Sequence, residues 1–163
     1  MGALRELELA PSQQRAEGPR LRLHVIYTNP QTTQASLNVA NLLAHDLGAT
    51  LELLVATVVP YPLPLNSPTA PAHFTEEFLS ALVSKCEVDV NVNVLLCRDR
   101  EETIPQWLPA ESIAVIGRRR RWGPESSWRL IRTLRKKGHH VIVVDAQKRL
   151  LAAASFCRER RSR

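Results

Sequence analysis

The chain has 163 residues, 44% of them hydrophobic, so it is long and apolar enough to bury one core of ordinary size. No apolar run approaches the roughly 20 residues that a membrane-spanning helix needs, and the first residues, MGALRELELA, lack the features of a secretion signal. We therefore expect a cytoplasmic protein. The three cysteines are odd in number and widely separated, which is typical of reduced thiols and argues against a disulfide or zinc framework.

Charge is distributed unevenly along the chain. The formal net charge is +6, but residues 118–163 carry 15 Lys and Arg against 3 Asp and Glu, a net +12. The rest of the chain carries 7 against 13, a net −6. A basic end of this kind favours nucleotides, nucleic acid or an anionic membrane surface as partners. The alternative interpretation is a solvated basic helix face followed by a disordered tail.

Strands and helices are predicted to alternate along the chain. Apolar runs rich in β-branched residues indicate strands at Leu21–Thr28, Thr50–Val59, Val88–Leu96, Ile113–Ile116 and Val141–Val144. Helices are expected between them, from a cap at Thr32 or Thr33 to Gly48, from Thr75 to about Lys85, from a cap at Asp99 to Pro109, and over Trp128–Gly138. This alternation predicts one α/β domain over residues 21–145, with a flexible extension over 1–20 and a basic tail over 146–163.

Two of the predicted strands differ in their patterns. Thr50–Val59 is long and apolar enough to lie in the middle of a sheet. Val88–Leu96 alternates valine with polar residues, which is typical of an edge strand or of a strand beside a loosely covered face. Between them, residues 60–74 contain five prolines, which exclude regular structure. This loop is interpreted either as a lid over a site or as a surface crossing without a role.

The last predicted helix has two contrasting sides. On one side, three apolar residues at helical spacing are expected to pack against the sheet, namely Trp128, Ile131 and Leu134. On the other side, basic residues are expected to stay solvated, namely Arg129, Arg132 and Lys136. The helix is therefore predicted to be amphipathic with a positive outer face.

Residues 113–144 form a strand–helix–strand unit, which predicts parallel strands and a right-handed crossover. Ligands of such sheets bind at the carboxyl ends of the strands, here at the loop that follows Ile116. The loop starts with Gly117 and contains four consecutive arginines, Arg118 to Arg121, before Ser126 and Ser127 lead into the helix. Glycine, guanidinium groups and the free N–H groups of a helix start together favour an anion.

The order of elements and the match of VIG, loop, helix and VIVVD resemble the universal stress protein family over roughly residues 21–145. The resemblance implies a single Rossmann-like, three-layer α/β/α domain with a five-stranded parallel sheet. It also implies a role in stress response, a homodimer paired through the last strand and, in many members, bound ATP or another adenine nucleotide. Nucleotide-binding members have an acidic residue after the first strand and a glycine-rich pattern after the fourth.

This sequence departs from the nucleotide-binding pattern of the family. After the first strand it has Thr28-Asn29-Pro30 without a carboxylate, and Arg120 occupies the position of the second glycine. Gly117 matches the first glycine, and Ser126-Ser127 approximately match the Gly-Ser/Thr step. By resemblance and by the argument from the loop, the candidate ligand-binding residues are Thr28, Asn29, Gly117, Arg118, Arg119, Arg120, Ser126 and Ser127.

Three functional hypotheses follow. The first is a small regulatory protein that binds a nucleotide or other phosphorylated anion at these residues. The second is a ligand-free dimeric scaffold of the same fold, and the third is a nucleic-acid binder that uses the basic carboxyl-terminal third.

No catalytic signature is present, so we expect no enzyme activity. Adjacent His139 and His140 at a strand start point to opposite faces and do not predict a metal site. Cys97, close to Arg98 and Arg100 in the sequence, is either a reactive thiol or an inert buried one.

Overall fold

The computed structural model describes residues 21–65, 76–118 and 125–146. Its strands are β1 (Arg22–Ile26), β2 (Thr50–Val58), β3 (Val90–Cys97), β4 (Ile113–Arg118) and β5 (His140–Asp145). Its helices are α1 (Pro30–Leu47), α2 (Glu76–Val83), α3 (Arg100–Trp107) and α4 (Glu125–Lys136). The expected extension over 1–20, most of the Pro-rich loop and the tail beyond residue 146 lie outside the described residues.

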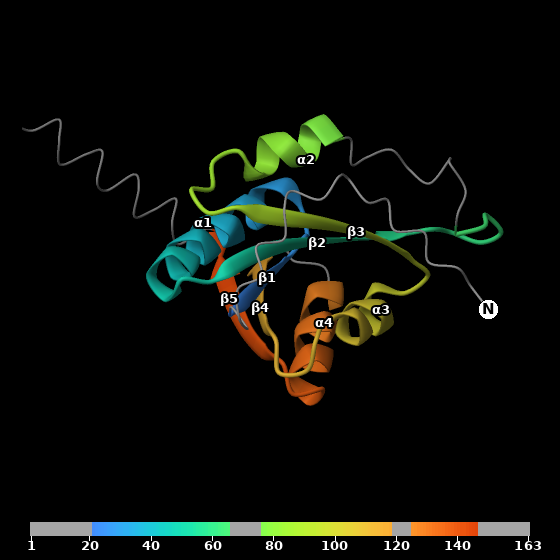
Figure 1. Cartoon of the computed structure of the whole chain (residues 1–163). Helices are drawn as coiled ribbons and strands as arrows, with labels where there is room; N and C mark the ends of the chain where they lie inside the picture. Colours follow the sequence, from blue (N-terminus) through green and yellow to red (C-terminus); the bar gives the residue numbers. More distant parts are fainter. Residues whose placement is uncertain (1–20, 66–75, 119–124, 147–163) are drawn as a thin grey trace, which may run out of the picture.

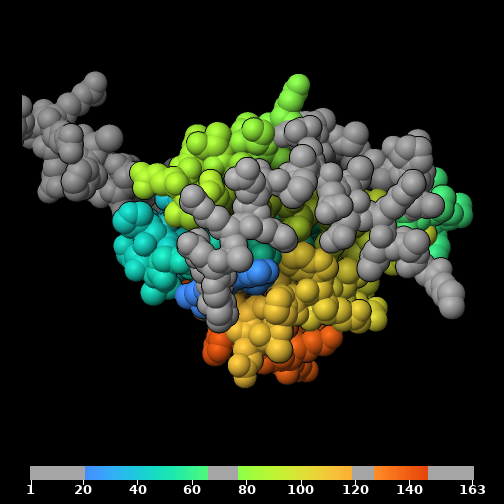
Figure 2. Space-filling model, viewed as in Figure 1, coloured from blue at the N-terminus to red at the C-terminus, as the bar shows by residue number. Residues whose placement is uncertain are grey.

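The five strands form one parallel sheet in the order β3-β2-β1-β4-β5. Helices α1 and α2 cover one face and α3 and α4 cover the other, which gives the three layers predicted from the sequence (Figure 1). In the space-filling view, the segments of β4 and α4 (gold to red) lie below those of α1 and α2 (cyan and light green) (Figure 2). The fold class expected from the alternation of elements is confirmed.

The order of strands places β1 at the centre, between β2 and β4. From β1 the chain builds outward to β2 and β3, and then crosses to β4 and β5 on the other side. The carboxyl ends of β1 and β4 therefore diverge at a topological switch point, where open α/β sheets bind ligands. β3 lies at one edge, as its alternating sequence predicts, and β2 lies inside the sheet.

Helix α1 begins earlier than predicted. Asn29 is its N-cap, because the Asn29 side chain accepts a 3.0 Å hydrogen bond from the backbone N–H of Thr32, and Pro30 takes the first helical position. The expected caps, Thr32 and Thr33, instead lie inside the helix and are fully buried. The helix ends as predicted at Gly48, whose left-handed backbone (φ 62°) places its N–H on the carbonyl of Ala44.

The two helices on the opposite face agree with the sequence in part. Asp99 caps α3, because Oδ1 accepts hydrogen bonds from the N–H groups of Glu101 and Glu102. In α4, Ile131 and Leu134 are buried as predicted. The prediction for Trp128 is wrong: its side chain is 52% exposed, at the border of the packed face.

The start of the Pro-rich loop is held by Arg98, which follows β3. Its Nη1 donates to the carbonyl of Val59 at 2.7 Å, its Nη2 donates to Leu63 at 2.5 Å, and its guanidinium lies 4.1 Å from the centroid of the Tyr61 ring. Residues 66–75 lie outside the described structure, so the choice between a lid and a surface crossing stays open. None of the helices described is long and apolar enough to cross a membrane.

Candidate functional site

The switch point brings together Thr28, which follows β1, and Gly117, near the end of β4. Thr28 Oγ1 donates to the Gly117 carbonyl at 3.1 Å and lies 2.7 Å from the hydroxyl of Thr32 on α1. The Thr28 backbone N–H donates to Thr33 Oγ1 at 3.1 Å. Two of the predicted site residues are therefore adjacent. The hydrogen-bonding groups of Thr28, however, are already used in contacts with β4 and α1.

Asn29 and Gly117, which were predicted to bind a ligand, have structural roles in this fold. The Asn29 side chain is used in capping α1. A Cβ atom on Gly117 would lie 2.1 Å from the carbonyl oxygen of Thr32 and 2.7 Å from Ser36 Oγ. Since real Cβ atoms do not approach backbone this closely, the glycine is required for α1 to pack on β4.

Arg118 is the last residue of β4, and its guanidinium carbon lies 4.8 Å from the centroid of the Trp128 ring in the first part of α4. This is a cation–π contact between the end of β4 and α4. Ser127 is partly buried in the first turn of α4. Of the remaining predicted residues, Arg119 and Arg120 lie outside the described residues, as does the side chain of Ser126.

Arg100 belongs to this edge of the sheet, although the site prediction omitted it. It is the first residue of α3, and its Nη2 donates to the carbonyl of Tyr27, directly after β1, at 2.5 Å. Its Nε is buried without a hydrogen-bond partner, and no carboxylate in the described part of the chain forms an ion pair with it. Burial lowers the pKa of Arg100, because desolvation disfavours the charged form.

A signal for Arg100 was present in the sequence. The first turn of a helix favours acidic residues, and Glu101 and Glu102 of α3 follow that preference. Arg100, at the first helical position, is an exception to this preference. It follows shortly after β3, whose carboxyl end lies at the edge of the sheet where ligands bind. A basic residue placed against the helix dipole at such an edge is a candidate anion contact.

Cys97, at the end of β3, lies next to Arg100 but is not activated by it. The thiol is buried, and desolvation raises the pKa of Cys97 even though the nearby Arg100 charge acts to lower it. Its Sγ lies 3.6 Å from the carbonyl of Thr57. Of the two interpretations, the structure favours an inert buried thiol.

Within the described residues, no group of three His, Cys, Asp or Glu side chains could hold a metal ion. His139 is buried and His140 is exposed, in agreement with their expected opposite orientations. His24 and Glu52, on neighbouring strands β1 and β2, lie in the core with Nδ1 3.2 Å from Oε2. Nδ1 lies within ion-pair distance of the carboxylate but makes no well-aligned hydrogen bond. Two such side chains are too few for a closed metal site.

Solved structures share this architecture. A universal stress protein from Archaeoglobus fulgidus is 16% identical, with a TM-score of 0.55 over 77% of this chain and 93% of its own. A universal stress protein from Archaeoglobus fulgidus in complex with dAMP is 13% identical, with a TM-score of 0.56 over 78% and 98%. The fold is that of the universal stress proteins. A further universal stress protein, in complex with cAMP, is 11% identical, with a TM-score of 0.50 over 78% and 98%.

The likeness to universal stress proteins is one of fold alone. No protein-family model matches the chain, and no curated protein matches it significantly. In this version of the universal-stress fold, Thr28 holds β1 to β4 and α1, and Arg100 brings a positive charge to the same edge. The edge thus combines internally bonded hydroxyl groups with a guanidinium that no carboxylate in the described residues neutralises.

Proposed function

We propose that this protein is a small, non-catalytic regulatory protein of the universal-stress type that binds an adenine nucleotide or another phosphorylated anion. The site is the carboxyl edge of the sheet between β1 and β4, with Arg100 and Arg118 as the charged contacts. Two universal stress proteins of this fold are seen with dAMP and cAMP, which supports an adenine nucleotide as the first ligand to test.

The observation that carries this proposal is the charge of Arg100, which no carboxylate in the described residues compensates. A partly buried cation without a carboxylate is costly, because it loses hydration and gains no opposing charge. One of its N–H groups is occupied by the Tyr27 carbonyl, and Nε has no acceptor. A phosphate group at the switch point would supply both a negative charge and acceptor oxygens, and charge-assisted hydrogen bonds to phosphate are among the strong ones.

A second candidate, a ligand-free dimeric scaffold, is favoured by a different observation. Thr28, Asn29 and Gly117 are all satisfied within the chain, so they need no ligand to complete their contacts. The outer strand β5 carries partly buried apolar residues, Val141, Ile142 and Val143, which would suit pairing with a second copy. Dimerisation through this strand is what the family resemblance implies.

Calorimetric titration of ATP and cAMP into the full chain, freed of co-purified nucleotide, distinguishes the two candidates. The first predicts saturable binding near one per chain. Arg100→Gln should then weaken affinity by about 10-fold or more, because a hydrogen bond to a charged group contributes roughly 1.5–3 kcal/mol. Lys85→Gln removes the same charge from an exposed position after α2 and should leave the affinity unchanged.

The outcome against the first candidate is equally specific. Absence of heat from any nucleotide, or equal affinity of the Arg100→Gln and wild-type proteins, would refute the site. Light scattering would then test the scaffold, for which Ile142→Asp on β5 should convert a dimer into a monomer. The unfolding midpoint of each variant is measured first, so that loss of the fold is not mistaken for loss of binding.

A further inference from the structure

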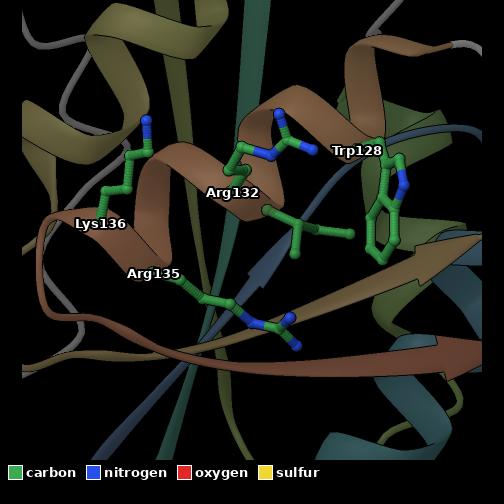
Figure 3. A pocket seen from close by; sticks show the side chains of 5 residues that line it. Trp128, Arg132, Arg135 and Lys136 are labelled. Atoms are coloured by element: carbon green, nitrogen blue, oxygen red, sulfur yellow. The ribbon is translucent and has the colours of Figure 1, made fainter.

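A second positively charged feature lies on α4, away from the hydrogen bonds of the switch point. A groove of about 360 Å³ runs along the helix and is lined by Trp128, Ile131, Arg132, Arg135 and Lys136. Figure 3 shows the labelled side chains projecting from α4, with Trp128 near its first turn and Lys136 near its last. We refer to these five residues as the α4 groove.

The positions of these residues explain why they form one surface. They follow the spacing i, i+3, i+4, i+7 and i+8, which places them on adjoining strips of one helix surface. The sequence pattern assigned the apolar and the basic residues to opposite sides, but the structure brings members of both sets to the same groove. Ile131 is buried and forms the apolar floor, while the three basic side chains are exposed. From Trp128 to Lys136 the helix rises about 12 Å. This length matches three to four nucleotides of a stacked strand, at roughly 3.4 Å each.

The basic side chains of the α4 groove have no carboxylate partner among the described residues. Within the described residues, no ion pair is found for Arg132, Arg135 or Lys136. A fixed row of exposed cations raises the local concentration of anions and favours a partner that carries negative charge at regular intervals. This charge pattern is what a polyanion requires.

Trp128 adds a feature that charge alone does not provide. Its indole is 52% exposed, although Arg118 lies over one side of the ring at 4.8 Å. An exposed large aromatic ring between cations is the combination that single-stranded nucleic acid uses, because bases stack on the ring while phosphates contact the charges. An acidic peptide would neutralise the cations but would leave the flat indole face without a matched partner.

We propose that the α4 groove binds a short stretch of single-stranded nucleic acid, about four nucleotides long. In this arrangement one base stacks at Trp128, extending the stack that Arg118 begins, and successive phosphates contact Arg132, Arg135 and Lys136. A paired duplex cannot offer an unstacked base, so the groove selects single strands. The groove shares Arg118 with the nucleotide site proposed above but does not use Arg100, so Arg100→Gln should weaken nucleotide binding and leave single-strand binding unchanged.

Fluorescence anisotropy of a labelled single strand of about 12 nucleotides tests this with matched variants. Trp128→Ala should weaken binding by about 5- to 150-fold, the range for loss of one stacked base, and Trp128→Phe should retain most of the affinity. The control is Tyr61→Ala, shortly after β2, which removes another aromatic ring that packs against an arginine and is 81% exposed. It should leave the affinity unchanged.

Salt dependence tests the phosphate contacts. The three contacts of the groove should alone contribute a fall in affinity of about 20-fold between about 50 and 200 mM salt, from a slope of roughly −0.7 for each phosphate. Arg132→Gln should reduce that slope by about 0.7, whereas Lys85→Gln should not change it. The rest of the basic carboxyl-terminal third adds to the total affinity equally in every variant, so the differences isolate the groove.

Several results would overturn the proposal. If the Trp128→Ala variant bound the single strand as tightly as the Tyr61→Ala variant, the stacking contact would be refuted. An unchanged salt slope in Arg132→Gln would refute the phosphate contact of Arg132. A duplex of equal length that binds as tightly as the single strand would exclude selection for unpaired bases. An oligoglutamate peptide that displaces the strand at equal concentration would assign the groove to an acidic protein partner instead.

Discussion

Replacing Gly117 with alanine tests why a glycine stands at the carboxyl end of β4. The added Cβ would lie 2.1 Å from the Thr32 carbonyl oxygen, 2.6 Å from its carbon and 2.7 Å from Ser36 Oγ. Two of these atoms are backbone of α1, so the clash cannot be relieved by rotating a side chain. Relief requires α1 to move away from the sheet where it packs on β4, and overpacking of a tight core costs about 1–3 kcal/mol, or occasionally more.

We expect Gly117→Ala to reach the upper end of that range, about 3 kcal/mol. Urea unfolding would show this as a lower midpoint with a similar slope. The control is Gly48→Ala at the end of α1, where nothing lies within 4 Å of the new Cβ but the backbone φ is +62°. That substitution costs only the left-handed conformation, roughly 1–2 kcal/mol. If Gly117→Ala proves no more damaging than Gly48→Ala, close packing on α1 is not the reason for the glycine.

Three further predictions concern stability and reactivity. Asn29→Ala should lower the free energy of unfolding by about 1 kcal/mol through loss of the α1 cap, and an unchanged urea midpoint would contradict this. The contact with His24 lowers the pKa of Glu52, so the unfolded chain binds that proton more readily and stability falls as pH drops below the ordinary carboxyl value. The difference in unfolding free energy between wild type and Glu52→Gln should therefore shrink as the pH falls below about 4.5. A difference that stays constant with pH would contradict this role of Glu52. In native protein, iodoacetamide should modify partly exposed Cys86 before buried Cys97, as peptide mass spectrometry would show; faster reaction of Cys97 would contradict its burial.

The sequence predicts the layers of this fold well, because hydrophobic periodicity and the alternation of elements are local signals. It also indicates correctly that β3 is an edge strand, since only one of its faces is apolar. The start of α1 was predictable too, from an asparagine cap followed by proline at the first helical position. The hydroxyl groups of Thr32 and Thr33 also match a cap, but they are needed inside the helix, where they contact Thr28.

Other features of the structure depend on contacts between residues far apart in the sequence, so no single segment predicts them. The buried face of α4 is centred on Leu130, Ile131 and Leu134, so Trp128 lies at its border although its spacing fits the apolar stripe. The role of Gly117 follows from how closely α1 approaches β4, which no local pattern reports. That no carboxylate among the described residues pairs with Arg100 likewise depends on how the chain folds.

The two cationic surfaces should respond differently to salt, and this difference separates their ligands. Arg100 is partly buried at the sheet edge, where charge interactions are screened less than on the surface. Arg132, Arg135 and Lys136 are exposed, and a polyanion bound there releases counterions from every phosphate it contacts. A mononucleotide at Arg100 should therefore lose little affinity over the salt range in which a single strand at α4 loses most of its own. Equal salt slopes for the two ligands would mean that both bind the same exposed charges, and the switch-point site would then have no support from binding.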